Sequence, residues 1–136
     1  MSIASSLTVI QFTDTGGTLR TLQCDLQDID YGGARAITKE ETFCAVTKAP
    51  GNPDNSITVA GLLNLDANRA HAVFQALKVD PTARLYKYGP AGSGSGSLLL
   101  SGVSWLVDYR IKATAGGTVK VNAKFEIDGD DVATTW

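Results

Sequence analysis

VSWLVDYRIK (residues 103–112) and VKVNAKFEID (residues 119–128) decide the fold of this chain. In residues 119–128, apolar and polar residues alternate one by one, and in residues 103–112 Val103, Trp105, Val107, Tyr109 and Ile111 alternate with Ser104, Leu106, Asp108, Arg110 and Lys112. Because successive side chains of a β-strand point to opposite faces of the sheet, each stretch predicts a strand with one apolar and one charged face. The residues TAGG (114–117) lie between them, and glycine there supplies the positive φ that a hairpin turn needs. The sequence therefore predicts a long two-faced hairpin.

Most of the remaining chain also has strand-like patterns. Strands are expected at residues 7–13, 18–30, 57–65 and 83–88. The apolar alternation slips by one residue at Asp28, and such a slip is typical of a β-bulge. Further short strands follow the same spacing, which predicts seven or eight strands in all.

Residues 67–78 predict the one helix, with Asp66 as its N-cap. Its apolar positions, Ala70, Val73, Phe74 and Leu77, recur at i, i+3, i+4 and i+7, the spacing of a single buried face. Because this helix interrupts a series of strands without a βαβ pattern, we expect a mainly β fold, an antiparallel sandwich or barrel with one packed α-helix. The expected core residues are Phe74, Leu77, Trp105, Val107, Val121 and Phe125.

Length and charge limit the classes of function. The 136 residues are expected to form one domain, residues 1–136, large enough for a core without metals or disulfides. A net charge of −2 argues against tight phosphate binding, which needs a basic surface. The start of the chain lacks the pattern of a secretion signal, and no stretch reaches the roughly 20 apolar residues of a membrane span. Cys24 and Cys44 are expected to be reduced, small core or interface residues.

A long polar segment follows the strand that we expect to end at Gly32-Gly33. It runs from about residue 31 to residue 56, contains one short strand candidate at 41–47, and is interrupted by APGNPDN (49–55). Long irregular connections are uncommon in compact domains and are often functional. We therefore expect a protruding arm or long loop that reaches another subunit or ring. Its candidate contact residues are Thr38, Lys39, Glu40, Glu41, Lys48 and Asn52.

We expect no catalytic residues, no metal and no cofactor. His71 is the only histidine, and no motif gives it a nucleophile or carboxylate partner. The acidic runs at residues 25–30 and 128–131 lack the full calcium loop and its final glutamate, which favours a solvated strand face and a polar turn. The Gly/Ser loop at 89–97 lacks the Lys-Ser/Thr of a phosphate loop, so it is interpreted as a flexible connection.

The order of these parts resembles that of a known family. A strand ending in YKYGPAG (86–92) leads to the Gly/Ser loop, then to a strand with the pattern SGxxxLxxY from Ser101, a Gly-Gly turn, a long strand and a closing Asp-Gly. Upstream lies ITVAGLLNLDA (57–67), followed by AVFQAL (72–77). Over about residues 55–131 the chain resembles the major tail tube proteins of long-tailed, non-contractile bacteriophages and related prophage or gene-transfer particles.

This resemblance implies a structural virion protein without enzymatic activity. Its subunits would form hexameric rings that stack into a tube, with one continuous β-barrel as the inner wall and DNA passing through without specific binding. The implied partners are further copies of the chain and the tail terminator, tape-measure and distal tail proteins, with no membrane contact. The implied location is the virion tail, after synthesis in the bacterial cytoplasm. The alternatives are a tube protein of a contractile or type VI secretion-like system and a monomeric β-sandwich module that binds carbohydrate or acts as an adhesin.

Two surfaces are candidates for contact with DNA or with other subunits. The strand at 18–30 carries an acidic run, so Gln23, Asp25 and Gln27 are candidate lumen-facing residues, because a conduit should repel phosphate. The alternative is that these acids only solvate an outer face. The polar face of the C-terminal hairpin has mixed charge, which suits subunit contact or a wall of mixed charge. Its charged residues are Asp108, Glu126 and Asp128 with Arg110, Lys112, Lys120 and Lys124.

Overall fold

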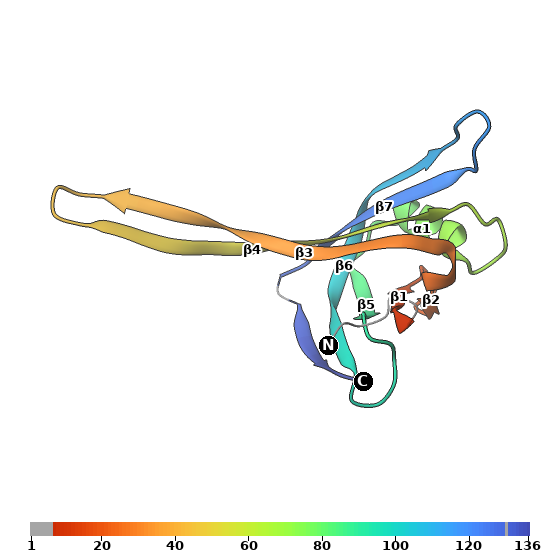
Figure 1. Ribbon diagram of the computed structural model, residues 1–136, viewed down its shortest axis with the longest axis horizontal. Helices are drawn as coiled ribbons and strands as arrows, with labels where there is room; N and C mark the ends of the chain where they lie inside the picture. The colour runs from red at the N-terminus through yellow and green to blue at the C-terminus, as the bar shows by residue number, and fades with distance from the viewer. Residues whose placement is uncertain (1–6, 130) are drawn as a thin grey trace.

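The strands of the computed structural model, which describes residues 7–129 and 131–136, form one antiparallel sheet with one α-helix beside it (Figure 1). The sheet order is β2-β1-β5-β6-β7-β4-β3, and β8 pairs with β6. With 55% strand and 11% helix, this confirms the predicted fold class. The bounds are β1 Val9–Thr13, β2 Leu19–Thr21, η2 Gln23–Asp25, β3 Leu26–Glu41, β4 Val46–Leu62, α1 Ala70–Val79, β5 Arg84–Gly89, β6 Leu98–Lys112, β7 Lys120–Ile127 and β8 Val132–Thr135.

The sheet curls until distant strands meet. Phe12 of β1 stacks on Phe125 of β7 with ring centroids 4.2 Å apart, although β5 and β6 separate these strands in the sheet order. Tyr31 of β3 likewise stacks on Tyr88 of β5, at 5.3 Å. A flat sheet could not make these contacts. The curled sheet therefore encloses a core between its two halves, and α1 contributes to that core.

The apolar face of α1 fills one side of this core. Phe74 is fully buried and meets Phe12, Phe125 and Tyr109 edge-on, with centroid distances of 5.4–5.8 Å. Edge-to-face geometry is a favourable arrangement for aromatic pairs. The positions expected at helical spacing are all buried, as are the expected β7 core positions. Buried among the expected residues are Ala70, Val73, Phe74, Leu77, Val121 and Phe125.

Trp105 and Val107 were expected in the core and do not lie there. A register shift between Leu106 and Asp108 interrupts the alternation of β6, which the sequence pattern does not reveal. Before the shift, Ser104 and Leu106 face the core, and after it Tyr109 does. The expected inward residues therefore point outward, and Val107 is 47% exposed. Phe12 of β1, rather than Trp105, stacks on Phe125.

The return strand of the N-terminal hairpin is interrupted, which was not expected. The return strand divides into β2, the short 3-10 turn η2 and β3, and Cys24 in that turn is exposed, so it is not a core residue. The bulge expected near Asp28 is present, as a register shift between Leu26 and Asp28. Gly61 allows this start of β3 to lie close to β4, because a Cβ on Gly61 would clash with the carbonyl oxygen of Asp25.

The strand does not end at Gly32-Gly33, and residues 34–56 are not an irregular loop. β3 continues to Glu41 and returns as β4 from Val46, forming a two-stranded hairpin that projects from the rest of the molecule (Figure 1). Pro50 and Pro53 are tolerated inside β4 because only β3 pairs with this part of it. Proline lacks the N–H donor and is therefore confined to open strand edges.

The start of the helix differs from expectation, and one short strand has no sequence signal. The helix begins at Ala70 rather than at residue 67, and Asp66 does not cap it; its backbone N–H donates to Asn64 Oδ1 at 2.9 Å. Asn68 adopts a positive φ of 63° just before the helix. The short strand β8 has an entirely exposed pattern, so no apolar periodicity indicates it.

The packing of Phe74 gives a first testable expectation. Phe74→Ala should lower the free energy of unfolding by about 3–5 kcal/mol, the usual cost of truncating a buried aromatic side chain. Val107→Ala is the matched control, since its side chain is largely exposed, and it should cost less than about 1 kcal/mol. Urea unfolding followed by circular dichroism measures both. A loss below about 1 kcal/mol for Phe74→Ala would contradict this packing.

Candidate assembly surfaces

The outer side of β3, β4, β7 and β6 is a continuous polar surface, which we call the polar face. Along β4 and β7, every second residue is buried in the core, so the residues between them point to the other side of the sheet. The charged and polar members of this surface are Asp28, Asp30, Thr58, Asp108, Arg110, Lys112, Lys120, Asn122, Lys124 and Glu126.

The register aligns these residues in rows across the four strands. In one row Asp30 lies beside Thr58, Thr58 beside Lys124, and Lys124 beside Asp108. The next row, toward the β6–β7 turn, runs from Asp28 through Ala60 and Asn122 to Arg110. The row nearest the turn contains Leu62, Lys120 and Lys112. These rows place acids on β3 and cations at the β6–β7 end of the same face.

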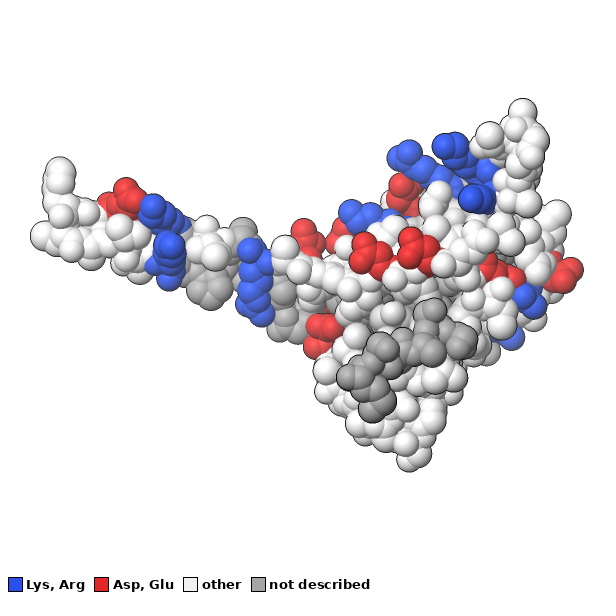
Figure 2. All heavy atoms as spheres, viewed as in Figure 1, with Lys and Arg blue, Asp and Glu red and all other residues white. Residues whose placement is uncertain are grey.

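Some of these charges are paired within the face. Arg110 Nε lies 3.0 Å from Asp108 Oδ2, and Lys124 Nζ lies 3.4 Å from Glu126 Oε1. Within the described residues, four further charges make no ion pair: Asp28, Asp30, Lys112 and Lys120. Figure 2 shows the resulting separation, with basic side chains gathered at the β6–β7 hairpin and acidic ones over the neighbouring part of the sheet.

Both sides of the polar face end in an open strand edge. β3 pairs with β4 alone, so its other edge has no strand partner in the described chain over Leu26–Glu41. β5 pairs with β6 only at Leu100–Ser104, so within the described residues the same side of β6 is open from residue 105 to residue 112. Open edges present unpaired backbone donors and acceptors, which natural proteins cover, close or block.

The projecting hairpin, residues 34–56, carries the arm residues expected from the sequence. Lys39, Glu40, Glu41 and Lys48 lie on its two strands, and Lys39 Nζ is 2.7 Å from Glu41 Oε1. The side chains of Thr38 and Asn52 lie outside the described part of the structure. At the tip, Cys44 is a free, exposed thiol, and Phe43 is fully exposed. Ile37 and Val46 of the same hairpin are exposed as well, so the arm presents several apolar side chains to solvent.

Asp25 was expected to line a channel with Gln23 and Gln27, and the structure instead turns it inward. Its side chain is buried and bound to the Arg69 guanidinium, with Arg69 Nε donating to Asp25 Oδ2 at 3.0 Å. The same oxygen accepts the backbone N–H of Ala70 at 3.1 Å, so Asp25 caps α1 from a distant segment. The Arg69 guanidinium holds the pKa of Asp25 below its ordinary value of 3.8.

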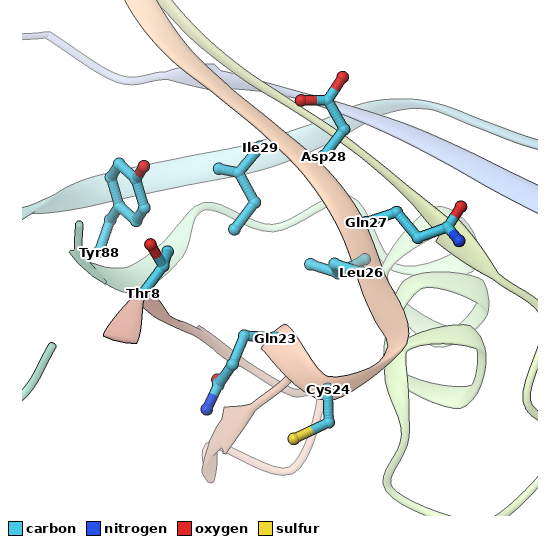
Figure 3. Close-up of a pocket in the computed structure, with 8 residues that line it drawn as sticks. All are labelled: Thr8, Gln23, Cys24, Leu26, Gln27, Asp28, Ile29 and Tyr88. Atoms are coloured by element: carbon cyan, nitrogen blue, oxygen red, sulfur yellow. The ribbon is translucent and has the colours of Figure 1, made fainter. Parts of the chain in front are cut away.

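Gln23 and Gln27 border a groove of about 580 Å³ between the start of β1, η2, β3 and β5 (Figure 3). Leu26 and Ile29 point toward Tyr88 across this groove, whereas Gln27 and Asp28 point away from it. Gln23 is bound locally, because its Oε1 accepts the backbone N–H of Ile10 at 3.4 Å. The groove follows from the incomplete closure of the curled sheet, and among the described residues that line it no charged cluster is directed into it.

A hydrogen-bond chain fixes the base of the projecting hairpin. Tyr31 of β3 donates its hydroxyl to Asp131 Oδ2 at 2.6 Å, and its oxygen lies 2.7 Å from the Tyr86 hydroxyl of β5. Burial and the neighbouring Asp131 carboxylate raise the pKa of Tyr31 far above its ordinary range. This chain joins β3, β5 and the segment before β8, so the hairpin projects from a fixed base.

His71 has a hydrogen-bond partner on β6. Its Nδ1 lies 2.7 Å from the Tyr109 hydroxyl, and burial raises the pKa of Tyr109 to about 12. Within residues 7–129 and 131–136, no group of three or more His, Cys, Asp or Glu side chains is placed to hold a metal ion. Among the described residues, no helix is long and apolar enough to cross a membrane.

The sequence matches no protein-family model, and comparison with curated proteins also gives no match. Solved structures, in contrast, share the fold. A chain from the tail of an empty gene transfer agent particle, refined with C6 symmetry, is 13% identical, with a TM-score of 0.71 over 98% of this chain and 100% of that chain. A chain from the virion of a native gene transfer agent particle is also 13% identical, with a TM-score of 0.75 over the same shares.

The SPP1 tail tube gives a third similar structure. Its identity is 10% and its TM-score 0.75, over 99% of this chain and 80% of that chain. Because these similarities extend over nearly the whole chain, the protein has the fold of phage and gene transfer agent tail tube proteins. This confirms, at the level of the fold, the resemblance drawn from the sequence.

The buried Asp25 gives an expectation for stability and pH. Asp25→Asn should lower the free energy of unfolding at pH 7 by about 1–3 kcal/mol, because it weakens the contacts to Arg69 and Ala70. Since the folded-state pKa of Asp25 lies below its unfolded value, its contribution is complete at neutral pH and is lost as the pH falls through the folded-state pKa.

Urea unfolding at several pH values from 7 downward tests this expectation. The difference between the unaltered chain and Asp25→Asn should shrink below pH 3.8, the ordinary pKa of an aspartate. Asp28→Asn is the control, because Asp28 is exposed and has no ion pair within the described chain. An equal loss in both variants at pH 7 would contradict the role given to Asp25.

Proposed function

We propose that this protein is the subunit of a tail tube, which assembles as stacked rings into a conduit for DNA. The observation that carries the proposal is the four-stranded polar face with an open strand edge on each side. Repeating such a unit around an axis joins edge to edge and closes the sheet into a barrel, which removes the edges. The tail tube fold of the similar structures supports the same assembly.

In this assembly the polar face lines the lumen and the edge of β3 meets β6 of the next copy. Rings of six follow the C6 symmetry of the gene transfer agent tail. The lumen residues are then Asp28, Asp30 and their row partners, in place of Asp25. Paired and unpaired charges of both signs make this wall a poor binder of phosphate, because phosphate affinity grows with each neutralising cation.

The projecting hairpin is the second element of the proposed assembly. Its exposed Phe43 tip, with Lys39, Glu40, Glu41 and Lys48 along the strands, reaches another copy in the same or the next ring. Thr38 and Asn52 belong to the same contact. The fixed base at Tyr31 supports this role, because an arm that projects at a defined angle loses less conformational entropy on binding.

The expected partners and location of the protein follow from its proposed role in a tube. The tube ends would contact terminator, tape-measure and distal tail proteins, and the finished assembly would reside in the virion tail after synthesis in the bacterial cytoplasm. The proposal assigns the chain no catalytic activity and no specific binding of DNA.

Assembly itself tests the proposal. The purified chain should form rings or tubes in negative-stain micrographs when concentrated. Replacing residues 35–53 by an Asn-Gly turn joins Ala34 to Asp54, which face each other in the register, and should give a folded monomer that no longer polymerises. Lengthening the turn at residues 114–117 by two glycines is a control that changes a hairpin without removing the arm.

Three results of that experiment would count against the proposal. A monomer at every concentration and salt would exclude the tube. Unimpaired tubes from the shortened chain would exclude the arm contact. Loss of folding in the shortened chain would assign residues 35–53 to the core, against the exposure of the side chains described among them.

The lumen assignment can be tested with added cations. Thr58→Lys together with Asn122→Lys should make open-ended tubes retain a short fluorescent DNA duplex, more strongly at low salt, because each copy adds two cations to the wall. Gln75→Lys adds a cation on the exposed side of α1 and should leave DNA retention inside the tube unchanged. Equal retention by both kinds of tube would place the polar face elsewhere.

A further inference from the structure

Two lysines on the polar face lie in an arrangement that the single chain does not explain. Lys112 and Lys120 are directly opposite each other in the antiparallel β6–β7 pair. Like charges in this position repel each other and destabilise the hairpin. Within the described residues neither lysine has an ion-pair partner, and the third member of their row is the apolar Leu62.

The opposite side of the face carries the complementary arrangement. Asp28 and Asp30 lie two residues apart on the open edge strand β3, so both carboxylates project from the same face. They too lack an ion-pair partner in the described chain. The unpaired acids are thus on one open edge of the sheet, and Lys112 is on the other.

Strand direction allows these two edges to pair. β6, β7, β4 and β3 alternate in direction, so β3 runs antiparallel to β6. A neighbouring copy related by rotation about a tube axis keeps its strand directions. Its β6 edge therefore meets β3 in antiparallel orientation, which is the ordinary pairing of the existing sheet.

Charge then selects one register for this pairing. If each row continues into the same row of the neighbouring copy, Asp28 faces Arg110 of the neighbour and Asp30 faces Asp108. This register places two acids opposite each other. A shift of one residue would turn β6 over, and that is incompatible with a buried core face. A shift of two residues toward the β6–β7 turn sets Asp28 opposite Lys112 and Asp30 opposite Arg110. Closure of a barrel itself requires such a stagger.

We propose that an ion pair between Asp28 of one copy and Lys112 of the next fixes the register of the seam between adjacent subunits in the ring. Asp30 and Arg110 form the second contact of the same seam. Lys120, across from Lys112, adds to the positive potential that the acids meet. This inference rests on the proposed ring assembly and adds the residues that set its lateral register.

Charge reversal of one partner at a time tests the seam. Asp28→Lys and Lys112→Glu should each raise the critical concentration for tube formation at least about tenfold, because each sets like charges against each other at every seam. Lys112→Glu should leave the monomer folded, since it replaces the repulsive lysine pair by an attractive pair with Lys120. Lys78→Glu and Asp66→Lys are controls that make the same charge changes at exposed positions away from both edges.

Mixing the two variants gives the sharper result. When Asp28→Lys and Lys112→Glu chains alternate around an even-membered ring, the lysine introduced in one variant meets the glutamate introduced in the other. At the remaining seams, an unaltered Asp28 meets an unaltered Lys112. A 1:1 mixture should therefore assemble within about threefold of the unaltered concentration, since a restored pair recovers most of the coupling. Native mass spectrometry of its rings should show equal numbers of the two variants.

Each other outcome overturns the inference in a distinct way. Normal assembly of either variant alone, or rings in which the two variants mix at random, would exclude the Asp28–Lys112 seam while leaving the tube intact. Failure to assemble in both the single variants and the mixture would mean that these residues serve another contact. Absence of rings from the unaltered chain would remove the proposed function and the seam together.

Discussion

The backbone groups that β3 and β6 leave unpaired constrain the rest of this structure. Water can solvate the isolated peptide groups of an exposed loop, but a row of unpaired peptide groups along a strand edge attracts another strand. The chain does not block its β3 edge with proline, and the prolines of the arm are on β4 instead. The charged side chains along each edge favour pairing with an edge of opposite charge. They oppose pairing with an identical edge, because two β3 edges would place acids opposite acids.

The aromatic core and the Asp25–Arg69 contact make those edges rigid. Phe12, Phe74 and Phe125 hold the two halves of the curled sheet together, so the polar face keeps one curvature. Asp25 binds η2 to α1 at the point where β3 begins. In the proposed ring, a seam closes only if each copy presents its edges at the same angle. Packing inside the monomer is therefore linked to assembly through geometry.

The periodicity of apolar side chains provided most of what the sequence could predict. It identified the strands of the β6–β7 hairpin, the buried face of α1 and the bulge near Asp28, because each has a regular apolar repeat or a visible break in one. The β6 bulge was missed because Val107 and Leu106 are equally apolar, so the break leaves no trace. The arm was misread as irregular because its strands bury nothing, and pairing of polar strands has no periodic signal. Asp25 and Asp28 have the same chemistry, and only the three-dimensional turn at η2 sends one inward and the other outward.

In the proposed tube, mixed charge on the polar face meets two demands that would otherwise conflict. A wall rich in cations would hold phosphate, and a wall with only acids would repel itself across every seam. The face carries four acids, Asp28, Asp30, Asp108 and Glu126, and four cations, Arg110, Lys112, Lys120 and Lys124. If the unpaired acids bind cations of the next subunit, the monomer's open edges become specific for each other, and the assembled wall presents DNA with fewer free cations. The same interactions that select the register would then keep the conduit from binding what passes through it.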